Sequence, residues 1–234
     1  MSAGRRRGGK RWLIWLLALP LAAVLIIPSA MKLYESKQPV PVPDETWSMT
    51  AEEVELIPAP ADWTPPGGKF EPHTTYVPAL DIVLPFHDAG ATNGWLDVER
   101  NTIDSGVRFK GAGAYTQGST VVAAHVNNSR LGKGPFAKLV DVEPGMEMIV
   151  TDAGATPYRF KATSLDYYLK EELPAQIWAV DGPSELTLIT CGGGLVRQSD
   201  GLLHYASNVV ARGTAIDPKV AVPLPGLTAQ APPG

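Results

Sequence analysis

The stretch Glu185-Leu-Thr-Leu-Ile-Thr-Cys191 is followed at once by Gly192-Gly193-Gly194, and it holds the only cysteine of the 234 residues. Its β-branched first part predicts a strand that delivers one thiol to the mouth of a flexible glycine loop. A lone cysteine cannot form an internal disulfide, so it is either a buried small hydrophobic residue or a nucleophile. The surrounding sequence decides between these two interpretations.

Short apolar runs rich in β-branched residues surround this stretch between about residues 74 and 217. Separated by Gly, Pro, Asn and Asp, they comprise residues 75–79, 81–85, 120–124, 146–151, 158–163, 185–190 and 208–211. Runs of this length and spacing predict a β-sandwich or barrel rather than βαβ units. Helices are expected only in short connections, such as residues 135–140 with Pro135 in the first turn. The segment is long enough for one sizeable hydrophobic core.

The N-terminal part of the sequence predicts export. Residues 1–11 carry five cations and no acid, and residues 12–31 carry no charge at all. An uncharged stretch of this length matches the roughly 20 residues of a transmembrane helix. Positive charge before it predicts a cytoplasmic segment 1–11, an anchor 12–31 in the cell membrane and an extracellular remainder. A cleaved signal peptide is the alternative, because Pro28-Ser29-Ala30 ends in small residues.

Two segments flank the predicted compact domain 74–217. Residues 32–73 are rich in proline and predict an extended extracellular linker, in which Thr50 and Glu53 can cap a short helix. Residues 218–234 predict a disordered tail. After residue 11 the chain has 15 Lys and Arg against 24 Asp and Glu. This acidic balance argues against binding of nucleic acid or anionic lipid by the exported part.

A nucleophilic cysteine needs a base or cation that holds it as a thiolate, and a donor for the oxyanion that its attack creates. The sequence offers four histidines: His73, His87, His125 and His204. His125 ends the predicted strand 120–125 and precedes a polar, glycine-containing loop. A strand-end imidazole and a strand-end thiol, 66 residues apart in sequence, can meet at one rim of a barrel. His125 is therefore the candidate partner of Cys191.

At these residues the sequence resembles a known family. Thr187-Leu-Ile-Thr-Cys191 fits the T-L-x-T-C signature of sortases, and residues 121–127 with 134–139 resemble the sortase segment that carries the catalytic histidine. The Cys-Gly-Gly sequence, with His204-Tyr205 and residues 208–211 further on, is most similar to class F, and class E is next. The resemblance covers roughly residues 74–215.

The resemblance implies an all-β fold, a closed barrel of about eight strands with short helices, and a cysteine transpeptidase without cofactor or metal. It implies that Cys191 attacks the threonine carbonyl of a Leu-Pro-x-Thr-Gly-like sorting signal of an exported protein. The resulting thioester is then resolved by an amine of a cell-wall peptide precursor. His125 is expected to act as general acid and base. Thr190 and His204 are the candidate substrate-binding residues.

The sequence departs from the family pattern at Ala206, where class F has an arginine. Arg197, six residues after Cys191, is the alternative catalytic arginine, because its guanidinium can donate to an oxyanion or to substrate carbonyls. Arg212 lies too far along the strand, roughly 20 Å from Ala206. Two alternatives therefore stay open: a catalytically weak sortase-fold protein that binds sorting signals, and a thiol peptidase that hydrolyses the acyl-enzyme.

Overall fold

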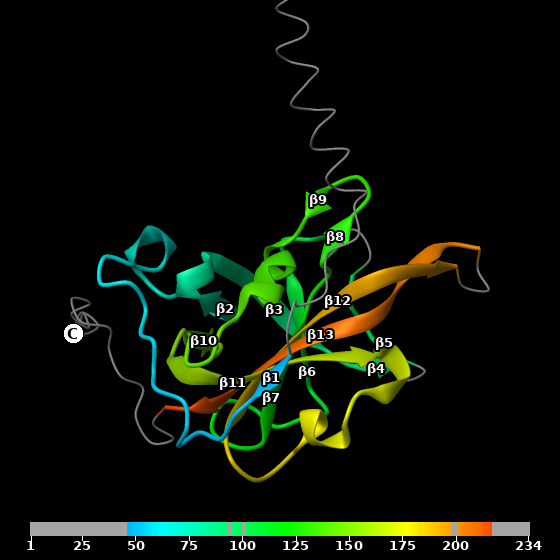
Figure 1. Ribbon diagram of the computed structural model, residues 1–234. Coiled ribbons are helices and arrows are strands. Elements are labelled where there is room, and N and C mark those ends of the chain that lie inside the picture. The colour runs from blue at the N-terminus through cyan, green and yellow to red at the C-terminus, as the bar shows by residue number, and fades with distance from the viewer. Residues whose placement is uncertain (1–45, 93–94, 100–101, 198–200, 217–234) are drawn as a thin grey trace, which may run out of the picture.

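The computed structural model describes residues 46–92, 95–99, 102–197 and 201–216 of the chain (Figure 1). The predicted cytoplasmic segment 1–11, the anchor 12–31, the first part of the linker and the tail 218–234 lie outside these residues. Within the described ranges, no helix has both the length and the apolar character to cross a membrane.

Eight strands form a closed barrel. Their order is β11-β10-β2-β3-β6-β7-β12-β13, and β13 pairs back onto β11. The strands are β2 (Thr74–Val77), β3 (Ile82–Ala89), β6 (Gly106–Phe109), β7 (Ser119–Ala123), β10 (Glu147–Thr151), β11 (Pro157–Leu169), β12 (Glu185–Arg197) and β13 (Leu203–Ala215). The prediction of an all-β barrel of about eight strands is thus confirmed. Strand β6 was not predicted, because four residues with little alternation give almost no sequence signal.

Short elements connect the barrel strands. The connections include two small hairpins, β4 (Ala91–Thr92) with β5 (Trp95–Leu96) and β8 (Asn127–Asn128) with β9 (Gly132–Lys133). The described residues also hold short 3-10 helices: η1 (Pro66–Gly68), η2 (Pro78–Leu80), η3 (Pro135–Asp141), η4 (Lys170–Glu172) and η5 (Ala175–Trp178). Pro135 occupies the first turn of η3, as predicted. It suits this position because its fixed φ matches a helix and its missing N–H is not needed there.

Side chains of β7 and β12 alternate between two apolar clusters. Val122 and Leu188 belong to a cluster contributed by strands from all around the barrel, which is the barrel interior. Val121, Ala123 and Ile189 belong to a second cluster on the outer face, which η5 helps to cover. Because both faces of these strands are buried, their sequences are nearly continuous apolar runs rather than alternating ones.

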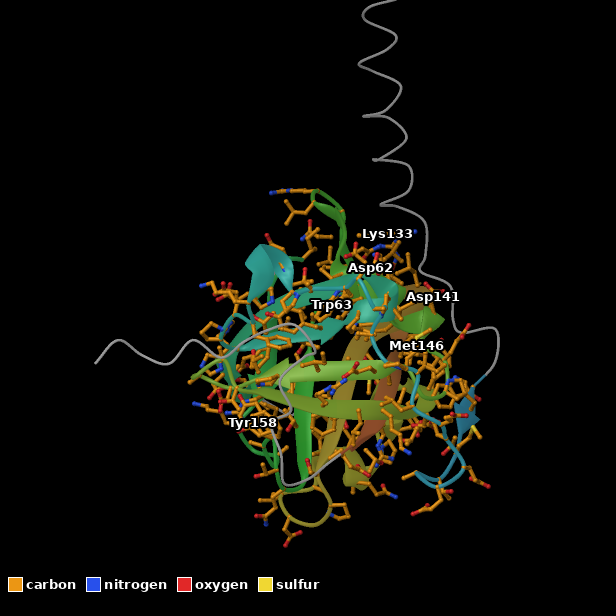
Figure 2. The ribbon with its side chains drawn as sticks, turned by 90° about the vertical axis from the view of Figure 1, so that its left-hand side faces the viewer. Asp62, Trp63, Lys133, Asp141, Met146 and Tyr158 are labelled. Atoms are coloured by element: carbon orange, nitrogen blue, oxygen red, sulfur yellow. The ribbon has the colours of Figure 1, made fainter. Side chains whose placement is uncertain are left out.

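Residues 46–73, which were predicted as part of the linker, lie along the barrel (Figure 2). The short strand β1 (Trp47–Ser48) pairs with β11. Val54 is only 4% exposed, and the Ala59 N–H donates to Glu147 Oε2 at 2.9 Å. Thr50 and Glu53 form a hydrogen-bonded turn instead of the predicted helix. The segment is fixed by these long-range contacts, which its proline content does not reveal.

Candidate active site

Cys191 lies in β12, and His125 follows two residues after the end of the neighbouring strand β7. Strands β7 and β12 run parallel, and Ile189↔Ala123 is their last paired position. The Ala124 N–H still donates to the Ile189 carbonyl at 3.1 Å. Continued by two residues, this register puts Cys191 opposite His125. Since alternate residues share a face, both follow Ile189 and Ala123 onto the outer face of the barrel.

Thr190 ties these two strands together. Its side chain is buried, and Oγ1 donates to the carbonyl of Ala124 at 2.9 Å. The bond joins the residue before Cys191 to the residue before His125. The hydroxyl of this predicted substrate-binding residue is therefore used within the protein, where it fixes the spacing of the two chain segments that carry the thiol and the imidazole.

The three glycines after Cys191 do not form the predicted flexible loop. They continue β12, which pairs with β13 up to Arg197, and the register shifts between Gly192 and Leu195. Gly193 has φ of +80°, and a Cβ there would overlap the Tyr167 hydroxyl. A Cβ on Gly192 would come within 2.8 Å of Val209 Cγ2. The glycines thus form a β-bulge. Glycine is needed there because the neighbouring side chains are packed closely against the backbone.

Burial acts against charge on both candidate catalytic groups. Burial raises the pKa of the Cys191 thiol, while the charge and a side-chain hydrogen bond of Lys170 act in the opposite direction. Burial lowers the pKa of His125; a backbone hydrogen bond with Glu99 opposes this, and the charge of Lys170 adds to it. The Nε2 atom of His125 is buried and has no hydrogen-bond partner among the described residues. Burial therefore favours the neutral thiol and the neutral imidazole.

Lys170 is a site residue that the sequence did not suggest. It is the first residue of η4, directly after the end of β11. Its ammonium lies 5.6 Å from the centre of the Trp95 ring in β5. Figure 1 shows the β4–β5 hairpin on the same side of the barrel as this end of β11. In the sequence, Lys170-Glu171-Glu172 is typical of a solvated cluster of charges. Only the pairing of β11 with its neighbours reveals that Lys170 belongs to the candidate site.

Arg197 and His204 lie further along the β12–β13 hairpin, which extends beyond the barrel (Figure 1). Arg197 ends β12 and is exposed, and its guanidinium donates to the Gly201 carbonyl of the same hairpin. His204 is partly buried and pairs with Val196 across the hairpin. Six strand residues separate Arg197 from Cys191, at most roughly 20 Å. The hydrogen-bond partner of Arg197 is thus a carbonyl of its own hairpin rather than the thiol.

A groove of about 670 Å³ lies elsewhere, between η3, β9 and the start of β3. Lys133 and Asp141 are among its lining residues and are labelled in Figure 2. Its lining contains neither Cys191 nor any of the residues that act on it. The groove is therefore separate from the candidate active site.

Comparison with known proteins gives one family. The family model of the sortase domain matches residues 76–215, more than half of the chain. This range runs from Tyr76 in β2 to Ala215, the last residue of β13. A sequence search against curated proteins gave no match.

Solved structures with a similar fold include several sortases. A lid mutant of Streptococcus agalactiae sortase C1 is 16% identical, with a TM-score of 0.46 over 62% of this chain and 68% of that chain. Sortase C-1 from Actinomyces oris is 17% identical, with a TM-score of 0.47 over 62% and 71%. Listeria monocytogenes sortase A is 17% identical, with a TM-score of 0.44 over 62% and 86%.

Proposed function

Because this chain belongs to the sortase family, we propose that it is a cysteine transpeptidase with its active site at Cys191 and His125. Its substrate is an exported protein with a Leu-Pro-x-Thr-Gly-like sorting signal. Its second substrate is an amine of a cell-wall peptide precursor. The class assignment, F before E, is part of this proposal and rests on the residues that follow Cys191.

One observation carries the assignment of the site. The parallel register of β7 and β12 supports this pairing, because it ends two residues before Cys191 and His125, and the Thr190 hydroxyl bonds the two chain segments together. A nucleophile and its base must lie within reach of one another, and a rigid sheet holds that geometry better than a loop does.

In the first half of the reaction, the Cys191 thiolate attacks the threonine carbonyl of the sorting signal. The new S–C bond pushes the carbonyl electron pair onto oxygen and gives a tetrahedral oxyanion. When this intermediate collapses, the C–N bond breaks and His125 gives a proton to the leaving amine. The product is a thioester between Cys191 and the signal. Because burial favours the neutral forms, it disfavours the reactive thiolate–imidazolium pair.

In the second half, the acceptor amine attacks the thioester carbonyl. His125 takes a proton from this amine, the C–S bond breaks, and Cys191 leaves as the thiolate. The new peptide bond joins the exported protein to the acceptor. Arg197 is the sequence-based candidate for the oxyanion donor, and His204 is the candidate contact to the substrate.

We further propose that the enzyme is held at the cell membrane by residues 12–31, with the barrel outside. The five cations before this uncharged stretch support that orientation. An anchored enzyme meets exported proteins and lipid-linked wall precursors at the surface where both emerge.

The test is a ligation assay with the full chain purified in mild detergent. A panel of fluorescence-quenched Leu-Pro-x-Thr-Gly peptides is incubated with and without an added amine, and Cys191→Ala is the control. Amine-dependent ligation that Cys191→Ala lacks supports the transpeptidase. Cleavage without ligation means a thiol peptidase, and binding without cleavage means a catalytically weak sorting-signal binder; either result overturns the proposal.

A further inference from the structure

The candidate site needs positive charge at Cys191, because burial disfavours the thiolate. A cysteine nucleophile is held as thiolate by a nearby cation, and the tetrahedral oxyanion needs a donor. The positive charge of Lys170 acts on both groups: it lowers the pKa of the Cys191 thiol and the pKa of the His125 imidazole.

Strand pairing explains how Lys170 reaches the thiol. Tyr168 in β11 pairs with Asn208 in β13, and Asn208 pairs with Cys191 in β12, so the three form one row across the sheet. Lys170 follows two residues after Tyr168, at the start of η4 and directly after the end of β11. The same ladder, extended by two residues, puts Lys170 opposite Ala206. From this place the Lys170 side chain reaches Cys191, to which it gives a side-chain hydrogen bond.

Trp95 holds the ammonium group from the other side. The Lys170 nitrogen lies 5.6 Å from the centre of the Trp95 ring, a distance at which the ring face attracts a cation. The lysine is partly buried, so its charge is less screened than that of a solvated side chain. The aromatic contact helps to keep the ammonium in place.

We propose that Lys170 is a catalytic residue of this enzyme, whose ammonium group contacts Cys191 Sγ and stabilises first the thiolate and then the oxyanion. This inference rests on the proposed transpeptidase function. In this step Lys170 donates a hydrogen bond to the oxygen that gains the carbonyl electron pair, while His125 carries the proton to the leaving amine.

The first experiment measures alkylation of Cys191 by iodoacetamide from pH 6 to 10, in the full chain in detergent. It needs no sorting signal, so its outcome is independent of the proposed substrate. Lys170→Met, which keeps the aliphatic stem, is expected to move the pH midpoint upward and slow alkylation at pH 7.5 by about tenfold, or one pKa unit. Lys170→Arg keeps the charge and is expected to stay within about threefold of the natural protein. Lys133→Met removes an exposed charge of β9 and serves as the control without effect.

The second experiment measures peptide cleavage by the same variants. Loss of an oxyanion donor costs on the order of 10²–10³ in turnover, so Lys170→Met is expected to fall by this amount and Lys170→Arg to recover much of it. An unchanged alkylation profile for Lys170→Met with an unchanged melting temperature overturns the role of Lys170. The same holds if Arg197→Met shifts the profile and Lys170→Met does not. A shifted profile in a protein that cleaves no peptide supports the Lys170 contact and overturns the transpeptidase function instead.

Discussion

Cys191 and His125 each follow by two residues the last paired position of the parallel strands β12 and β7, Ile189↔Ala123. They come from chain segments 66 residues apart, and a buried side-chain hydrogen bond, from Thr190 Oγ1 to the Ala124 carbonyl, joins those segments just before the two residues. The geometry of the site is therefore a property of the sheet, and changes to the sheet are expected to alter the chemistry.

Removal of the Thr190 hydroxyl is expected to weaken the site and the fold together. Thr190→Val leaves the Ala124 carbonyl without its buried donor, which costs about 1–3 kcal/mol of unfolding free energy. Thr190→Ser keeps the hydroxyl and serves as the matched control. Urea unfolding followed by tryptophan fluorescence measures the difference. Equal stability of the two variants would show that the bond does not hold the strands.

The pKa of the Cys191 thiol is raised by burial, so less thiolate exists at any given pH than for a solvated cysteine. We expect the rate of alkylation by iodoacetamide to rise about tenfold per pH unit from pH 7 to 9 without levelling off. In the chain unfolded in guanidinium, levelling is expected near pH 8.5, the ordinary thiol pKa. Mass spectrometry of the alkylated protein gives both rates. A plateau below pH 8 in the folded protein would contradict the raised pKa.

Substitution of His125 is expected to lower peptide turnover without lowering the accessibility of the Cys191 thiol. His125→Gln removes the general acid and base, which lowers peptide turnover on the order of 10²–10⁴-fold. Alkylation of Cys191 at pH 9 needs no proton shuttle and should stay within a few-fold of the natural rate. Stopped-flow cleavage and alkylation on one preparation give the comparison. Full turnover by this variant would remove His125 from the mechanism.

The bulge after Cys191 is expected to tolerate no side chain at Gly193. Gly193→Ala imposes a positive φ on a residue with a Cβ, at a cost of about 1–2 kcal/mol, and adds an overlap with the Tyr167 hydroxyl. A Cβ on Gly194 meets nothing within 4 Å, and its φ is ordinary, so Gly194→Ala is the matched control. Thermal unfolding and peptide turnover are measured for both. Adding Tyr167→Phe to Gly193→Ala should restore part of the loss, since it removes the overlapping atom.

The Glu147–Arg159 ion pair is expected to hold the segment 46–73 on the barrel. The Glu147 side chain is 1% exposed, pairs with Arg159 and accepts the Ala59 N–H. Glu147→Ala leaves a largely buried guanidinium unpaired, which costs about 3–5 kcal/mol. Limited proteolysis should then cut within residues 46–73. The exposed pair Lys69–Glu71 gives the control, because Glu71→Ala should cost less than about 1 kcal/mol.

Local patterns predicted much of the barrel. The runs at residues 120–124 and 185–190 became β7 and β12, because β-branched residues bounded by turn formers specify a strand wherever it is placed. Pro135 likewise started η3. The residues around Cys191 and His125 also predicted these two as a pair, as did the family motif, and the pairing stays a prediction.

Other features were beyond the reach of local patterns. The glycines 192–194 predicted a loop, yet they form a bulge, because their conformation depends on Tyr167 and Val209 from other strands. Residues 32–73 predicted an extended linker, yet contacts with Glu147 and β11 hold the described part, residues 46–73, against the barrel.

The sequence by itself determined that this protein is a sortase-type barrel with one thiol at the end of an apolar strand run, since alternation, turn residues and a signature are all local properties. Only the tertiary structure decided which charge faces that thiol. Lys170 meets Cys191 across two strand pairings, Tyr168↔Asn208 and Asn208↔Cys191. Such pairings join residues far apart in the chain through backbone hydrogen bonds. The sequence next to the lysine therefore contains no pattern that predicts them.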